Sequence, residues 1–277
     1  MKSLSIRRRR NLGILLLLSI VVIVIDRLLS VSLYPVAFVS GWLLFSLVAL
    51  LAAYNIRKKL PFLPLGSSST WLQVHIYGGL LSGVVFVVHI AGRVPNGGFE
   101  VVLSALFLGV FCSGVIGLML SRWIPPRLTT RARDSQEVLF ERIPIFVRRI
   151  RDEVEAMVLE CGSQAESTVV PAFYASRLKP FFERPRNFWS HVLHIQRPRL
   201  KLLREIESQE GYLSEVEKSV MGDMVERVKQ KDDLDYQYAL QALLKYWLFV
   251  HIPLTSGLLV FVVFHLALVY AFAGGVR

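Results

Sequence analysis

Apolar residues form five runs along the chain, and charged residues gather between them. A helix needs about 20 mostly apolar residues to cross the hydrocarbon core of a bilayer. The runs that approach or exceed this length are residues 12–25, 34–54, 71–91, 101–120 and 246–273. The pattern therefore predicts an all-α integral membrane protein with about five transmembrane helices.

The first run is short, and the arginines Arg7 to Arg10 precede it. This order is also typical of a secretory signal peptide. No convincing small-x-small cleavage motif lies before the second run, so we interpret the first run as an uncleaved membrane anchor.

A long polar segment separates the fourth run from the fifth. Between Ser121 and Lys245 it holds 21 of the 32 Lys and Arg residues and 19 of the 21 Asp and Glu residues. We expect three regions: a membrane domain at 1–120, a helical cytoplasmic domain at 121–244, and a final transmembrane helix at 245–277.

Two apolar stripes with a helical period run through the polar segment. They comprise Leu139, Ile143, Phe146, Val147, Ile150, Val154, Met157 and Val158, and then Leu213, Val216, Val220, Met224 and Val228. Pro144 favours a helix start near that residue, and Ser214 with Glu217 fits a capping box. No Gly or Pro interrupts the chain between Asp232 and Pro253, so the last soluble helix is expected to continue into the fifth run.

Basic residues predict the orientation. Three clusters alternate to one side of the membrane, at Arg7 to Arg10, at Arg57 to Lys59, and at Arg122, Arg127, Arg131 and Arg133. Cytoplasmic loops carry such an excess of Lys and Arg, so the N-terminus and 121–244 are expected in the cytoplasm and the C-terminus outside. Most of the net charge of +11 comes from Lys2 with Arg7 to Arg10 and from Arg57 to Lys59, because the polar segment, with 21 basic and 19 acidic residues, contributes only +2. We expect membrane lipid rather than nucleic acid as the partner of this basic chain.

Two cysteines, Cys112 and Cys161, form neither a CxxC nor a CxxCH motif. Covalently attached c-type heme, a zinc ribbon and an iron–sulfur site within this chain are therefore not expected.

The third and fifth runs repeat one histidine pattern. Trp71-Leu72-Gln73-Val74-His75-Ile76 returns as Trp247-Leu248-Phe249-Val250-His251-Ile252, and a second histidine follows 14 positions later in each, as His89 and His265. Fourteen helical residues turn about 1400°, roughly 40° short of four turns, and rise about 21 Å. Both histidines of a run therefore face the same neighbour at two depths of the bilayer.

The two runs are expected to lie parallel, which pairs His75 with His251 and His89 with His265. An antiparallel arrangement would instead pair His75 with His265. Two imidazoles from facing helices at each level suit axial ligation of a heme iron.

Small residues lie between the histidines, at Gly78, Gly79, Ser82 and Gly83, and at Thr255, Ser256 and Gly257. They would let a porphyrin approach the backbone, and they would equally let membrane helices pack closely.

These two runs resemble the heme-binding core of membrane diheme b-type cytochromes, a group that includes quinone-linked cytochrome b subunits and the ferric-reductase-like family. The resemblance covers about 40 residues and carries over to His75, His89, His251 and His265. It implies two noncovalent hemes b with four histidine axial ligands, and electron exchange with quinone or a redox partner protein. The chain departs from the family core in two ways. The polar segment of about 120 residues is inserted before the last ligand helix, and the sequence contains no flavin, nucleotide or iron–sulfur motif.

The leading hypothesis is therefore a membrane-bound electron-transfer subunit of a larger quinone-linked oxidoreductase, in a bacterial cytoplasmic membrane. Its partners would be quinone, a cytoplasmic flavoprotein or iron–sulfur protein, and a cytochrome on the outer side. One alternative is a transporter or a proton or metal-ion relay that uses the intramembrane histidines. Another is a membrane-anchored scaffold, which leaves the repeated histidines unexplained.

Other candidate residues carry weaker signals. His191 and His194 stand three positions apart without a cysteine or carboxylate cluster in the sequence around them, which favours a solvated or structural role over metal binding. Arg93, Arg122 and Arg127 fall near the two membrane boundaries, where they could pair with heme propionates or anchor the helices at the interface.

Overall fold

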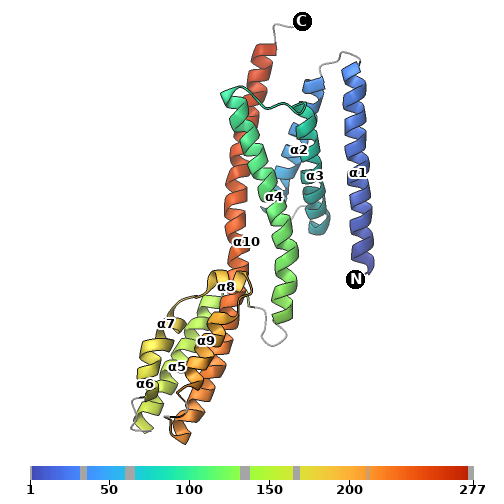
Figure 1. Cartoon of the computed structure of the whole chain (residues 1–277). Coiled ribbons are helices and arrows are strands. Elements are labelled where there is room, and N and C mark those ends of the chain that lie inside the picture. The colour runs from blue at the N-terminus through green and yellow to red at the C-terminus, as the bar shows by residue number, and fades with distance from the viewer. Residues whose placement is uncertain are drawn as a thin grey trace. The chain divides into compact units, whose positions relative to one another are not determined.

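The computed structural model describes residues 2–31, 36–59, 66–131, 138–164, 169–209, 211 and 213–273. All of its long elements are helices. Its five long apolar helices are α1 (Lys2–Val31), α2 (Val36–Lys59), α3 (Ser68–His89), α4 (Gly98–Arg131) and α10 (Glu215–Ala273) (Figure 1). Each is long and apolar enough to cross a membrane, which confirms the predicted fold class and indicates an integral membrane protein.

The chain forms two compact units. The membrane unit comprises residues 1–119 and 247–277, and the helical unit comprises residues 120–246. Short elements fill the helical unit between the long helices: α5 (Ile143–Gln164), α6 (Val169–Phe173), a π-helical turn η1 (Tyr174–Leu178), α7 (Lys179–Glu183), α8 (Phe188–Val192) and α9 (Arg197–Glu207).

Two of the long helices extend well beyond their apolar runs. The helix α4 continues through Pro125 and Pro126, and the Thr129 hydroxyl donates to the carbonyls of both prolines at 3.2 and 3.0 Å. Beyond the apolar run, Ile124 and Leu128 are buried against Tyr236 and Leu240 of α10. Tertiary packing in the helical unit thus sustains a helix that the two prolines alone would weaken.

The helix α10 is a single helix of 59 residues, so the expected continuation of a soluble helix into the fifth run is confirmed. It begins at the predicted capping box. The Ser214 amide donates to Glu217 Oε2 at 2.9 Å, and the Glu217 amide donates to Ser214 Oγ at 3.4 Å. These two bonds satisfy backbone donors that the first turn of a helix leaves unpaired.

The core of the helical unit follows the two predicted stripes with three corrections. Leu139 and Phe146 are exposed, because α5 begins only at Ile143 and its buried face follows Ile143 and Val147 instead. Val216 is exposed in the first turn of α10. The buried core of this unit includes Val147, Ile150, Val154, Val158, Leu213, Met221, Met224 and Val228.

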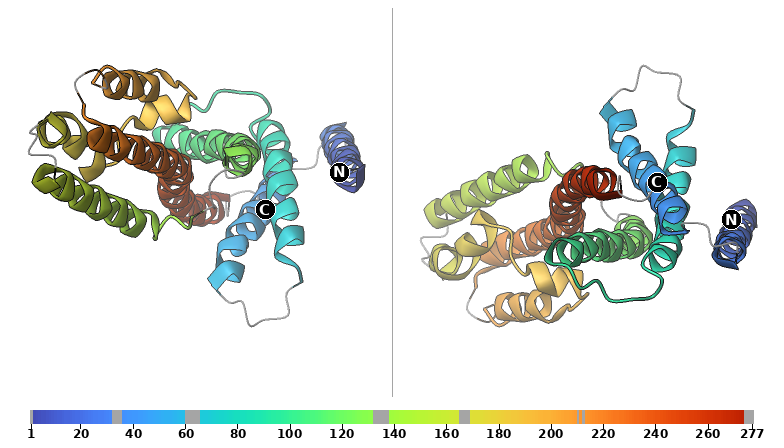
Figure 2. Two further views of the ribbon diagram at one scale, coloured as in Figure 1. Left: turned by 90° about the horizontal axis from the view of Figure 1, so that it is seen from below. Right: turned by 90° about the horizontal axis from the view of Figure 1, so that it is seen from above.

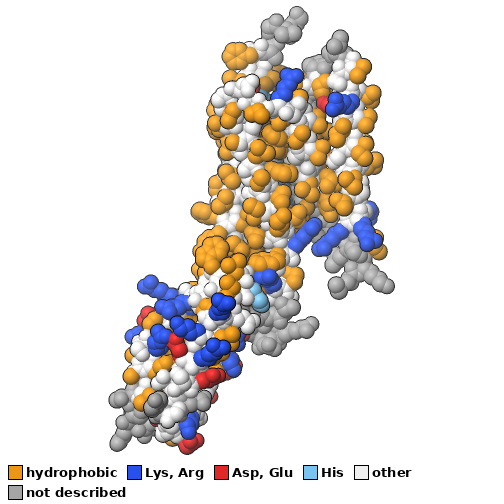
Figure 3. Space-filling model, viewed as in Figure 1, with side chains coloured by type: hydrophobic (Ala, Val, Ile, Leu, Met, Phe, Trp, Pro, Cys, Tyr) orange, Lys and Arg blue, Asp and Glu red, His pale blue; other side chains and the backbone are white. Residues whose placement is uncertain are grey.

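In the membrane unit, α3 packs on α2 and on α1 (Figure 2). The Asn11 amide of α1 donates to Gln73 Oε1 of α3 at 2.8 Å. Apolar side chains cover the outer surface of this unit, whereas Lys, Arg, Asp and Glu are dense on the helical unit (Figure 3). Some residues used for the expected span limits and orientation lie outside the described residues: Tyr34, Arg133 and 274–277.

Candidate functional site

All four predicted ligand histidines lie on α3 and α10 within the membrane unit. The rings of His89 and His265 lie edge to face, with their centres 6.4 Å apart and their planes at 88°. His75 and His251 lie on the same two helices, each 14 residues before the second histidine of its helix. The structure therefore brings the histidines together as two levels: a first level of His75 and His251, and a second level of His89 and His265.

At the first level, α2 holds His75. The Nδ1 atom of His75 lies 3.2 Å from the Leu51 carbonyl oxygen, which can only accept, so Nδ1 carries the hydrogen. The Tyr54 ring lies beside the imidazole, with the ring centres 5.0 Å apart. These contacts fix the orientation of the ring and assign any metal-binding role to Nε2.

The other histidine of the first level, His251, is held by α4. Its Nδ1 lies 3.1 Å from Ser113 Oγ. The Trp247 ring stacks on the imidazole at 5.3 Å between centres, and the Trp247 indole donates to the Ser113 carbonyl at 2.8 Å. A Cβ at Gly117 would overlap the Trp247 ring, so only glycine at this position leaves room for Trp247.

At the second level, α2 holds His89 through Ser40. The Ser40 hydroxyl lies 3.2 Å from His89 Nδ1 and 2.9 Å from the Val36 carbonyl, to which it donates. Ser40 Oγ therefore accepts from Nδ1, and Nε2 again becomes the candidate metal ligand. A Cβ at Gly41 would lie 3.0 Å from His89 Cε1, so the glycine lets the ring lie against the α2 backbone.

The helix α4 also reaches the second level, at His265. The Phe99 ring lies nearly parallel to the His265 ring, with their centres 6.3 Å apart and their planes at 13°. The ligand helices are thus each backed by a neighbour, since α2 contacts both histidines of α3 and α4 contacts both histidines of α10.

A serine–glycine pair supports one histidine at each level. Ser40 and Gly41 contact His89, while Ser113 contacts His251 and a Cβ at Gly114 would lie 3.8 Å from its Cε1. We call these two pairs the histidine cradles. Histidines that bind metals usually have the second ring nitrogen bonded to a carbonyl, a carboxylate or another polar group. The cradles and the Leu51 carbonyl give three of the four histidines this arrangement.

An apolar layer fills the interior between the two levels. Val48, Phe86, Phe107 and Leu258 are buried together, from four different helices. The rings of Phe86 and Phe107 stack with their centres 4.2 Å apart. Among the described residues, this buried apolar layer separates the two histidine levels.

The small residues between the histidines divide into two groups. Gly83 packs on Phe111 and Gly78 on Leu51, which is helix packing. In contrast, a Cβ at Gly79 or Gly257 would meet nothing within 4 Å. The hydroxyls of the group bond to carbonyls of their own helices: Ser82 to Gly79, Thr255 to His251 and Ser256 to Ile252.

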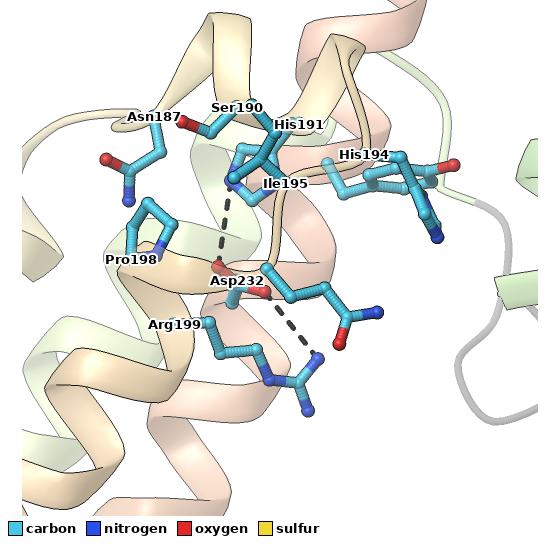
Figure 4. A pocket seen from close by; sticks show the side chains of 10 residues that line it. Asn187, Ser190, His191, His194, Ile195, Pro198, Arg199 and Asp232 are labelled. Carbon is cyan, nitrogen blue, oxygen red and sulfur yellow. Dashed lines mark ion pairs between the residues drawn. The ribbon is translucent and has the colours of Figure 1, made fainter.

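His191 lies outside the membrane unit and is buried. Its Nε2 is 3.6 Å from Asp232 Oδ1, and Arg199 lies 3.6 Å from the other oxygen of Asp232 (Figure 4). No local pattern indicated this carboxylate, because Asp232 is far from His191 along the chain. Within the described ranges, no cluster of three or more His, Cys, Asp or Glu side chains is arranged to hold a metal ion.

The three arginines considered for heme propionates have different surroundings. The Arg127 guanidinium lies 3.7 Å from the centre of the Trp123 ring and donates to the Val192 carbonyl at 3.4 Å, both within the helical unit. Arg93 and Arg122 are exposed.

Sequence reasoning missed the cradles. Their signal was present as the repeated Ser-Gly dipeptides of the second and fourth apolar runs, Ser40-Gly41 and Ser113-Gly114. A comparison of the chain with known protein families, with curated proteins and with solved structures finds no match.

Proposed function

We propose that this protein is a membrane-bound diheme cytochrome b that passes electrons across the bilayer. One b heme would be held by His75 and His251, and the other by His89 and His265, each iron taking one Nε2 from α3 and one from α10. Heme iron supplies reversible one-electron chemistry when it is bound. The protein would serve as the electron-transfer subunit of a larger quinone-linked oxidoreductase.

The separation of His89 and His265 is the observation that carries this proposal. An imidazole nitrogen binds a transition metal at about 2.0–2.1 Å, so two imidazoles that held one iron between them would have ring centres about 6 Å apart. The observed separation of 6.4 Å matches this distance.

The bonds at Nδ1 support the same function. A hydrogen bond to Nδ1 fixes the tautomer, orients the ring and raises the basicity of Nε2. Leu51, Ser40 and Ser113 supply such partners to His75, His89 and His251.

The apolar layer argues against the transporter or ion-relay alternative. A proton or metal-ion relay needs polar or ionisable groups in sequence across the membrane. Val48, Phe86, Phe107 and Leu258 occupy the interior between the two levels instead. Electrons can cross such a layer by tunnelling, whereas ions need a hydrated or liganded path.

The positions of the basic residues support one orientation for this function. With Arg7 to Arg10 in the cytoplasm, the helical unit also lies in the cytoplasm, and the C-terminus lies on the outer side of a bacterial cytoplasmic membrane. The first level is then nearer the cytoplasm. Electrons would pass between quinone and redox partner proteins, with a flavoprotein or iron–sulfur protein inside and a cytochrome outside.

A reduced-minus-oxidised visible spectrum of the detergent-purified protein tests the proposal. We expect low-spin b-type bands and about two noncovalent hemes per chain, quantified against protein. Expression should include a heme supply, so that an empty site cannot be due to shortage. A protein that stays colourless under these conditions would overturn the proposal and move the relay alternative to the front.

A further inference from the structure

The segment 184–204 of the helical unit combines positive charge with exposed apolar side chains. This basic segment contains six Lys and Arg residues and no Asp or Glu. The whole polar region from Ser121 to Lys245 is nearly neutral, with 21 basic and 19 acidic residues. Of the cations of this segment, Arg199 pairs with Asp232 and Asp233 of α10. Arg197, Lys201 and Arg204 are exposed, so positive charge is available at the surface of the segment.

Large apolar side chains are exposed at the centre of the same segment. Trp189 is 67% exposed, Leu193 is 65% exposed and Ile195 is 44% exposed. They lie on α8 and on the turn that follows it. Exposed aromatic and aliphatic residues flanked by cations are the features of segments that lie in the interface of a bilayer.

The backbone of this turn is well defined. His194 has a φ of 59°, the Ile195 amide donates to the Ser190 carbonyl at 2.7 Å, and the His194 amide donates to the His191 carbonyl at 3.2 Å. These bonds form a Schellman motif that ends α8. The exposed side chains are thus held by an ordered turn.

Contacts with α4 and α10 fix where the segment lies within the helical unit. The Phe188 ring contacts the Tyr246 ring, with centres 6.3 Å apart, and Arg127 donates to the Val192 carbonyl. Tyr246 is the residue at which the apolar run of α10 begins, and Trp123, stacked under Arg127, follows the apolar run of α4. Aromatic residues at such positions mark the membrane–water boundary.

A buried ion pair attaches the start of the segment to α10. Lys231 pairs with Asp235, and both are buried. Lys231 Nζ also donates to the Arg184 carbonyl at 2.8 Å, and the Arg186 amide donates to Asp235 Oδ2 at 3.2 Å. The segment is therefore attached to α10 at two places: Arg184 and Arg186 bond to Lys231 and Asp235, and Phe188 lies beside the boundary residue Tyr246.

We propose that α8 and its turn insert Trp189, Leu193 and Ile195 into the headgroup region of the bilayer that the chain itself spans. The flanking cations would bind anionic lipid headgroups. The charge of the segment fits an anionic lipid surface, and its contacts with Arg127 and Tyr246 lie beside the limits of the apolar runs of α4 and α10. This surface does not depend on whether the histidines bind heme.

A depth measurement on the full-length protein tests the proposal. Cys112 and Cys161 are replaced by alanine, and a bimane fluorophore is attached to Leu193→Cys in lipid nanodiscs that contain doxyl-labelled lipids. The matched control is Leu159→Cys on α5, which is 74% exposed. It lies 16 residues beyond Ile143 along α5, about 24 Å at 1.5 Å per residue. The start of α5 is tied to α10 by the bond from Lys245 to Glu141.

We expect doxyl lipids labelled near the headgroup to quench the Leu193→Cys probe several-fold more strongly than the Leu159→Cys probe. Quenching should be stronger in phosphatidylcholine nanodiscs that contain phosphatidylglycerol than in phosphatidylcholine alone. Exchanging Arg197 and Arg204, both exposed, for glutamate should remove that difference. Far-UV circular dichroism checks that each variant remains helical, and Ile195→Cys provides a second probe position.

Equal, weak quenching at both positions would overturn the proposal, because it would place the turn in water. A blue-shifted Leu193→Cys emission without lipid quenching would also overturn it, and would assign the surface to a protein partner or a second copy of the chain.

Discussion

Both histidine levels consist of one histidine from α3 and one from α10, but different residues contact the imidazole rings at the two levels. At the first level, the Leu51 carbonyl and Ser113 bond the imidazoles, and the rings of Tyr54 and Trp247 lie beside them. At the second level, Ser40 bonds one imidazole and the Phe99 ring stacks on the other.

The comparison shows where each level is vulnerable. A backbone carbonyl cannot be removed by substitution, so His75 keeps its Nδ1 partner whatever side chain replaces Leu51. His89 is bonded by the Ser40 hydroxyl, which a substitution can remove, and it lies at the last residue of α3. The second level therefore depends more on single side chains and on how α3 ends, whereas the first depends on close packing around Trp247.

The largest expected effect comes from removing one histidine of a level. His265→Ala should lower the heme content from about two per chain to about one, because an iron at that level keeps only one protein ligand. His251→Ala should remove the other heme with a distinguishable spectrum. Pyridine hemochrome assay against protein concentration measures both.

The control for these variants is His194→Ala, an exposed histidine of the helical unit, which should leave both hemes in place. If His265→Ala kept two hemes, the pairing of His89 with His265 as ligands would be wrong.

The second-largest effect is expected from a substitution that disturbs the packing around His251 at the first level. Gly117→Ala should displace Trp247, because the added Cβ would overlap the indole ring. Since Trp247 stacks on His251, we expect loss of most heme at the first level and retention at the second. The measurement is a visible spectrum of the double variant Gly117→Ala and His265→Ala. Because His265→Ala should remove the heme of the second level, the remaining heme signal would come from the first level.

Gly109→Ala is the matched control on the same helix, since a Cβ there meets nothing within 4 Å. Equal heme content in the two glycine variants would mean that Trp247 is not needed to position His251.

A smaller effect tests the cradle of the second level. Ser40→Ala removes the hydroxyl that accepts a hydrogen bond from His89 Nδ1. Loss of an outer-shell partner of a metal-bound histidine typically costs about 10–100-fold in metal affinity or activity. We therefore expect Ser40→Ala to lower the heme affinity of the second level by about 10–100-fold. Heme titration of the apoprotein in the His251→Ala background measures this affinity.

Ser46→Ala is the control on the same helix, because its hydroxyl bonds the Trp42 carbonyl of its own helix at 2.9 Å. An unchanged affinity in Ser40→Ala would show that the cradle has no part in binding.

Sequence reasoning could predict the fold class, but not which residues of other helices contact the histidines. Hydropathy determines where a helix can cross a bilayer, and the 14-residue spacing puts His75 and His89 on one face. The partners Leu51, Ser40 and Ser113 come from other helices, and no local pattern determines which residue of α2 meets which turn of α3. The carboxylate beside His191 was missed for the same reason, since Asp232 reaches it only through tertiary packing.

The smallest expected effect concerns the end of α3. Ala91 has a φ of 51°, the Gly92 amide donates to the Val87 carbonyl at 3.1 Å, and the Ala91 amide donates to Val88 at 2.9 Å. This Schellman motif places an alanine where glycine is preferred. A left-handed conformation costs a non-glycine residue about 1–2 kcal/mol, partly offset by the greater freedom of glycine in the unfolded chain.

Ala91→Gly should therefore stabilise this end of α3 by a few tenths to about 1 kcal/mol, and the second-level heme should be retained to a slightly higher temperature. Gly92→Ala provides the opposite change, since Gly92 has a φ of 66°, and should release that heme at a lower temperature. Thermal melts followed at the heme absorbance in the His251→Ala background measure both variants. If the two variants shifted the second level in the same direction, the backbone at the end of α3 would not control how His89 is held.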